Sequence, residues 1–284
     1  MKKQQLILTI GGLVVLFGLL FFGKIDQKKP AVRPENNPMA AGFNIEDQLK
    51  RSKISLNPAQ ASFVTKIEKE AEFETDNLAK GKLYQQLASY WHDSAQNHEL
   101  FVFYTNKAAL LVNSEKNLTF AARLILAEAR DESQGPIRIW KSDLAIELFE
   151  KAIAMNADND SLKVELASCY VFGKGMAGMT DETMRGVQQL LQVVRKDSSN
   201  MYAQMVLGIG GVLSTQYDKA ISRLELVMKN EPKNLEAVSW LADAYAAKKD
   251  KVNAIKWYNY SKALVNNPNF SLEVDKRIKS LNKD

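Results

Sequence analysis

The sequence has a single cysteine, Cys169, and only two histidines, His92 and His98, among its 284 residues. One cysteine cannot form an intramolecular disulfide, and no cysteine near the N-terminus offers a site for a lipid anchor. The histidines are six residues apart, which places them on different faces of a helix. A helical zinc site would need a spacing of four and a third ligand. We therefore expect no metal site and no cofactor.

Motifs for catalysis are absent, and the one motif that resembles a nucleotide site lacks the secondary structure that such a site needs around it. Residues 173–178 read G-x-G-x-x-G, but a helix is expected before them where a dinucleotide site needs a parallel strand. We interpret them as a glycine-rich loop between helices, with Met176 and Met179 folding back onto the array. No serine, cysteine or lysine stands in a recognisable nucleophile motif. The sequence predicts no catalytic residue, no small-molecule substrate and no enzyme.

Net charge is also lacking outside the N-terminus. Residues 1–33 hold six of the 38 basic residues and one of the 33 acidic ones, which leaves 32 of each sign for residues 34–284. The overall charge of +5 therefore belongs to the N-terminus. A neutral remainder has no electrostatic footprint for DNA or RNA, so we expect no nucleic-acid partner.

A long apolar run opens the chain. Residues 4–23 carry no charge and are mostly large apolar side chains, and about 20 such residues span a bilayer core of roughly 30 Å. We predict one transmembrane anchor over residues 1–23, with residues 5–22 in the membrane. A cleaved signal peptide is the alternative, but the run is longer than most signal cores and no small-residue cleavage site follows closely.

A proline-containing tether is expected over residues 24–47, where Pro30, Pro34 and Pro38 alternate with polar residues. Two arguments about orientation conflict. More basic residues follow the anchor than precede it, which favours a cytoplasmic domain, whereas a short N-terminal tail before a long domain favours export. We predict a single-pass protein of a bacterial inner membrane with a periplasmic domain, and keep the cytoplasmic orientation as the alternative.

The strongest pattern is an internal repeat. Residues 201–234 and 235–268 match one another at a period of 34, the period of the tetratricopeptide repeat (TPR). Small residues recur where two helices would cross closely: Gly208 matches Ala242, and Ala220 matches Ala254. Strand-like alternation long enough to predict a sheet is absent. The chain resembles the tetratricopeptide family, which implies an all-α fold, an α-solenoid of helix-turn-helix units.

Weaker matches extend the pattern to about five units over residues 81–268. In the second unit, extra residues including Gly135-Pro136 are expected to form a loop. An N-terminal helical segment is predicted over residues 48–80, in which Asn57 caps a helix that runs to about Lys80 and buries Phe63, Ile67 and Ala71 on one side. A C-terminal capping helix is predicted over residues 269–284, with Ser271 as its N-cap.

The resemblance also indicates where a partner would bind, since the first helix of each unit lines the concave surface in this family. The residues at the corresponding positions are Tyr202, Met205, Ile209, Val212, Val164 and Val171. Family members that clamp a terminal carboxylate have lysine and asparagine where this chain has Met205 and Ile209, so carboxylate clamping is disfavoured. The apolar set fits a hydrophobic or helical segment of a partner, unless the glycine-methionine loop or the N-terminal helix fills the groove internally.

The sequence therefore favours a membrane-anchored TPR scaffold that binds a partner protein or peptide segment at the cell envelope, without catalytic activity. The alternatives are a structural assembly subunit of an envelope or cytochrome c maturation complex, or a chaperone-like holder of client proteins. These roles come from the resemblance, and no residue in the chain identifies the partner.

Overall fold

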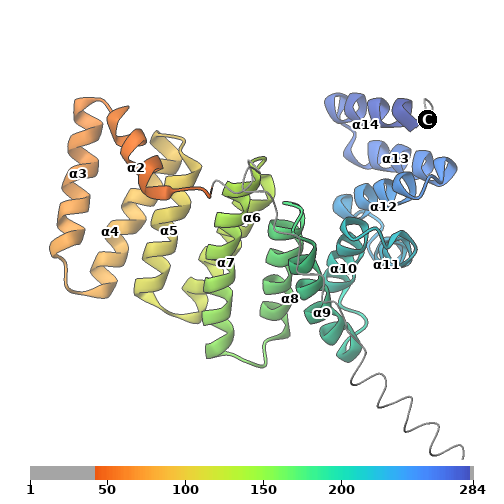
Figure 1. Cartoon of the computed structure of the whole chain (residues 1–284), viewed down its shortest axis with the longest axis horizontal. Coiled ribbons are helices and arrows are strands. Elements are labelled where there is room, and N and C mark those ends of the chain that lie inside the picture. The colour runs from red at the N-terminus through yellow and green to blue at the C-terminus, as the bar shows by residue number, and fades with distance from the viewer. Residues whose placement is uncertain (1–41, 282–284) are drawn as a thin grey trace, which may run out of the picture. The chain divides into compact units, whose positions relative to one another are not determined.

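The computed structural model describes residues 42–281, and every regular element in this range is a helix (Figure 1). The all-α prediction is thereby confirmed for this part of the chain. No helix within the described range is long and apolar enough to cross a membrane. The predicted anchor at residues 1–23 lies outside the described residues, as does most of the predicted tether.

Ten of the helices form five consecutive antiparallel pairs, each packed against the next. Two first helices are continued by a π-helical turn, α4 by η2 and α8 by η3. In chain order the paired elements are α4 (Asn77–Ser89) and η2 (Tyr90–Ser94) with α5 (His98–Val112), α6 (Glu115–Asp131) with α7 (Gly135–Met155), α8 (Asp160–Ser168) and η3 (Cys169–Gly175) with α9 (Thr180–Lys196), α10 (Met201–Leu213) with α11 (Tyr217–Asn230), and α12 (Leu235–Ala247) with α13 (Lys251–Val265).

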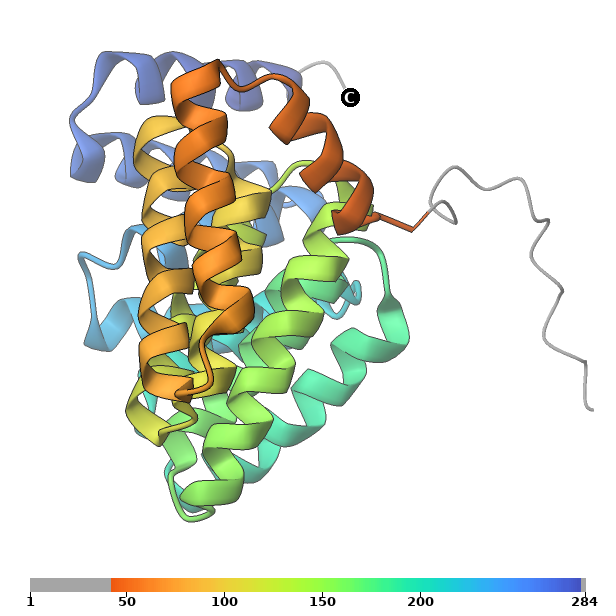
Figure 2. The same ribbon diagram turned by 90° about the vertical axis from the view of Figure 1, so that its left-hand side faces the viewer.

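Within residues 42–281, three further helices flank the pairs. At the N-terminal end, α2 (Ile45–Ile54) packs on α5, and α3 (Pro58–Phe73) lies alongside α4 (Figure 2). At the C-terminal end, α14 (Pro268–Leu281) packs on α13 and buries Val274. Because the last pair would otherwise expose its apolar side, α14 has the role of a cap.

Side-chain caps fix where most helices begin. Asn57 is the N-cap of α3, as the Asn-Pro pair predicts, and it also forms a capping box with Gln60. Polar residues at several other starts accept a hydrogen bond from a backbone N–H of the first turn: Asp76, Asn97, Ser114, Asn159, Asn200, Asn234 and Asp250. These caps satisfy backbone donors that have no partner inside the helix.

Small residues allow the helices of a pair to approach closely. Ala220, Ala242 and Ala254 are completely buried. A Cβ added to Gly208 would lie 2.6 Å from Leu224 Cγ, so only glycine fits where α10 crosses α11. The close crossings predicted from the 34-residue period are therefore present.

Several predicted boundaries are wrong. The helix that Asn57 caps ends at Phe73 rather than Lys80, because Asp76 starts a new helix, and it buries Val64 beside Ile67 and Ala71 while Phe63 stays 41% exposed. Residues 45–47, assigned to the tether, belong to α2. The cap of α14 is Asn267, whose side chain accepts hydrogen bonds from two backbone N–H groups, and not Ser271.

One predicted loop is helical instead, and a second is helical in its first part. Gly135 and Pro136 form the first turn of α7, where proline needs no N–H partner. The glycine-rich segment from Gly173 continues η3 as far as Gly175, and Met176 packs on the core as expected. The element that leads directly into these glycines is the helix α8 and not a strand, so the segment lacks the geometry of a dinucleotide site.

Candidate functional site

The six residues predicted to line an open groove are mostly internal. Met205, Ile209, Val164 and Val171 are at most 4% exposed and belong to one core cluster. Tyr202 is 38% exposed, and Val212 is half-buried against the same cluster. Four of the six residues therefore lie in the core, and Tyr202 and Val212 lie at its edge.

The π-helical turn η3 contributes to this burial. It extends the first helix of its pair beyond Ser168 and packs against α6, α7, α9 and α10. Phe172, from this turn, is 1% exposed in the same cluster as Ile209. The N-terminal helices contribute nothing to that cluster. The lengthened first helix thus supplies part of the cover, and α12 packs on α10 as well.

Ion pairs also link side chains on the face formed by the first helices of the pairs. Arg123 Nε and Nη2 donate to the two carboxylate oxygens of Glu165 at 2.7 and 2.6 Å. Arg130 pairs with Glu236 of α12, and its guanidinium lies 3.9 Å from the ring centroid of Phe172.

Tyr202 lies among these groups, with its hydroxyl 3.2 Å from Ser168 Oγ. Burial raises the pKa of Tyr202, so its phenol is neutral at physiological pH. Arg123, Arg130, Glu165 and Glu236 are thus all paired on this face.

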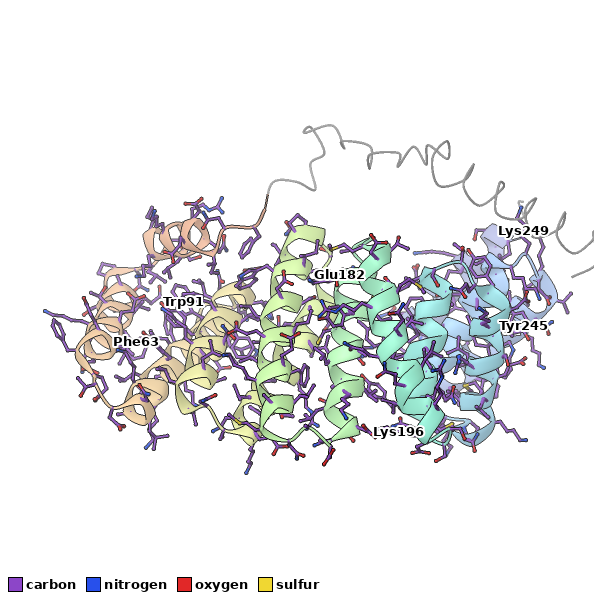
Figure 3. The ribbon with its side chains drawn as sticks, turned by 60° about the horizontal axis from the view of Figure 1, so that its bottom comes forward. Phe63, Trp91, Glu182, Lys196, Tyr245 and Lys249 are labelled. Atoms are coloured by element: carbon purple, nitrogen blue, oxygen red, sulfur yellow. The ribbon has the colours of Figure 1, made fainter. Side chains whose placement is uncertain are left out.

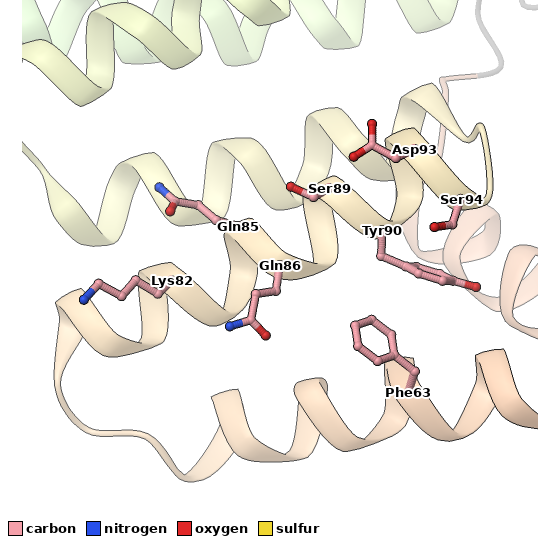
Figure 4. A pocket seen from close by; sticks show the side chains of 8 residues that line it. All are labelled: Phe63, Lys82, Gln85, Gln86, Ser89, Tyr90, Asp93 and Ser94. Atoms are coloured by element: carbon pink, nitrogen blue, oxygen red, sulfur yellow. The ribbon is translucent and has the colours of Figure 1, made fainter.

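An open groove lies elsewhere, between α3 and the first helix of the first pair (Figure 4). Its volume is about 610 Å³. It is lined by Phe63, Lys82, Gln85, Gln86, Ser89, Tyr90, Asp93 and Ser94.

Two aromatic rings form the apolar part of this groove. Phe63 of α3 and Tyr90 of η2 face one another with ring centroids 5.2 Å apart (Figure 4). Figure 3 shows Phe63 at the N-terminal end of the row of helices, whereas Trp91, the next residue after Tyr90, points inside and is 1% exposed. Burial raises the pKa of Tyr90, and its hydroxyl oxygen is buried with no hydrogen-bond partner among residues 42–281.

The remaining lining is suited to polar recognition. Gln85, Gln86 and Ser89 offer amide and hydroxyl groups along α4, and Lys82 and Asp93 add one charge of each sign. Amide side chains can donate to and accept from a peptide backbone. The groove can therefore hold an apolar side chain and its flanking backbone.

Sequence reasoning missed this groove because it placed Phe63 on the buried side of its helix. A period of about four fits Phe63, Ile67 and Ala71 as well as it fits the buried set that contains Val64. The spacing of apolar residues alone cannot decide which of the adjacent Phe63 and Val64 is buried. The polar residues between Lys82 and Asp93 gave the only available signal that this side of α4 is open.

No protein-family model and no curated protein matches the chain. Similar solved structures include YrrB, described as a TPR protein with an unusual peptide-binding site, at 16% identity, covering 74% of this chain and 97% of that one, with a TM-score of 0.42. MamA 41-end from Desulfovibrio magneticus RS-1 is 16% identical over 66% of this chain and 95% of its own, with a TM-score of 0.43. The TPR domain of P58(IPK) is 15% identical over 84% and 74%, with a TM-score of 0.31.

Proposed function

We propose that the chain is a membrane-anchored helical-repeat scaffold that binds a peptide segment of a partner protein and catalyses no reaction. The observation that carries the proposal is the groove of Figure 4, where two facing aromatic rings stand beside amide and hydroxyl side chains. Aromatic anchors in a partly desolvated pocket supply most of the affinity at many protein interfaces.

The groove suits an extended segment with one large apolar side chain. That side chain would pack against the touching rings of Phe63 and Tyr90, on the side of the rings that faces the groove. Gln85 and Gln86 would pair with the backbone on either side of the anchor. Because Lys82 and Asp93 have opposite signs, no strong charge preference is expected along the segment.

Residues 5–22 would hold this scaffold in a bacterial inner membrane with the helical domain in the periplasm. The support for the anchor is the uncharged apolar run of residues 4–23. Carbonate extraction should leave the full-length protein in the membrane pellet, and protease added to spheroplasts should remove the domain. Digestion only after lysis would favour the cytoplasmic orientation.

Binding is tested by affinity capture of partners from solubilised membranes with the full-length protein. We expect Phe63→Ser to lose the specific partner and Phe120→Ser to keep it. Phe120 is the matched control, because it is a 63% exposed phenylalanine on α6, outside the groove. Equal capture by both variants would contradict a role for the groove.

A further inference from the structure

The only two histidines of the chain meet at one place in the structure. His92 lies in η2 and His98 is the first residue of α5, and their ring centroids are 6.0 Å apart. The expectation that they occupy different faces is wrong because the helix does not continue between them. After the π-helical turn, Trp91 C=O accepts a hydrogen bond from Asn97 N–H at 2.7 Å, and this bond turns the chain back into α5.

Each imidazole is oriented by a carboxylate. His92 Nδ1 lies 2.7 Å from Asp93 Oδ1, and His98 Nδ1 lies 3.0 and 3.1 Å from the two oxygens of Glu128. Glu128 is itself placed by Lys141, a 2% exposed lysine whose Nζ lies 3.5 Å from the carboxylate. An Nδ1–H that donates to a carboxylate leaves the Nε2 lone pair free to bind a metal.

The spacing of the rings suits a shared ion. Metal–nitrogen bonds of about 2.0–2.1 Å would put the centroids of two ligating imidazoles roughly 5–6 Å apart. The two side chains are 47% and 56% exposed, so an ion and its waters can reach both from solvent. Within residues 42–281 no cluster of three or more histidine, cysteine or acidic side chains is placed to hold a metal, so water would fill the remaining positions.

We propose that His92 and His98 bind one divalent transition-metal ion of the Zn²⁺, Ni²⁺ and Cu²⁺ class through their Nε2 atoms, with Asp93 and Glu128 as positioning residues. Imidazole prefers these ions over Mg²⁺ and Ca²⁺, which take oxygen ligands. A bound ion would tie η2 to the start of α5, and through Glu128 to α6 of the next pair. This site does not depend on the scaffold role.

The test is calorimetric titration of untagged full-length protein with ZnCl₂, because a polyhistidine tag would bind zinc itself. We expect one ion per chain. His92→Ala and His98→Ala should each weaken binding at least tenfold, and Glu128→Gln should weaken it about 10- to 100-fold while keeping both ligands. Glu99→Gln makes the same change in the first turn of α5, away from the hydrogen bonds of both imidazoles, and should leave the affinity unchanged.

Melting temperatures in EDTA check that each variant is folded, and zinc should raise the melting temperature of the wild type and of Glu99→Gln. MgCl₂ should give no saturable heat with any of them. Zinc binding that survives in the double variant H92A/H98A, or that is absent from the wild type, would overturn the proposal.

Discussion

At the scale of single residues, burial separates positions that the repeat pattern treats alike. Ile209 and Tyr202 both fall on the side of a first helix that the resemblance assigns to ligand binding. Ile209 is completely buried, whereas Tyr202 is 38% exposed. The first therefore contributes to folding, and only the second can touch a partner.

Ile209→Ser should lower the free energy of unfolding by about 2–5 kcal/mol, since it removes buried apolar atoms and leaves a cavity. Chemical denaturation of residues 44–284 measures the change. Val212→Ser is the matched control one turn along α10, where the half-buried side chain has less to lose. An unchanged denaturation midpoint for Ile209→Ser would instead support the prediction that Ile209 lines an open groove.

The ion pair of Glu132 with the buried Lys141 gives a prediction about pH. Burial of Glu132 favours its neutral form, but hydrogen bonds from Gln134 N–H at 2.8 Å and from Lys141 Nζ at 3.1 Å outweigh burial and lower its pKa. A carboxyl whose pKa is lower in the folded state stabilises the fold above its unfolded pKa, about 4.3. This contribution of Glu132 to the free energy of unfolding is lost as the pH falls through the pKa that Glu132 has in the folded state.

Glu132→Gln should therefore cost about 1–3 kcal/mol at neutral pH and flatten the fall in stability below pH of about 4. Thermal melts of both proteins across this pH range provide the measurement. Glu147→Gln changes an exposed carboxylate with a loose 3.9 Å contact to Lys151, and should leave the profile of the wild type intact. Parallel profiles for wild type and Glu132→Gln would show that this pair does not control acid stability.

At the scale of helices, the sequence predicts where two helices cross more accurately than where a helix ends. The 34-residue period places Ala220 and Ala254 at contacts between paired helices, and both are completely buried. Periodicity cannot detect a π-helical turn, because one extra residue shifts the face without a change in composition. The end of α3 was missed for a different reason: residues 74–76 contain neither glycine nor proline, although Asp76 carried a capping signal.

Ala254→Arg should unfold the C-terminal pairs, because a large charged side chain at a close crossing costs at least several kcal/mol. Lys248→Arg keeps an exposed charge that pairs with Asp218 at 2.6 Å and should melt like the wild type. Circular dichroism during heating compares the two variants. If they melt at the same temperature, the repeat register is wrong.

At the scale of the whole molecule, the site depends on an element outside the repeat. The apolar side of α3 covers the first pair through Val64, Ile67 and Ala71, while Phe63 remains beside Tyr90 in the groove. The sequence could predict the helical array, since each pair repeats one pattern. It could not predict the groove, because that surface arises where the pattern stops and a helix with no repeat signature packs on the first pair.

The most direct test of the account is to map where the partner touches the scaffold. A photo-crosslinking amino acid replaces Phe63 in one full-length variant and Tyr202 in another, and both are irradiated in native membranes. Both positions are partly exposed, 41% and 38%, so access to the crosslinker is matched. We predict a crosslinked partner from position 63 and none from position 202; a partner that crosslinks from position 202 alone would contradict the assignment of binding to the groove between α3 and α4.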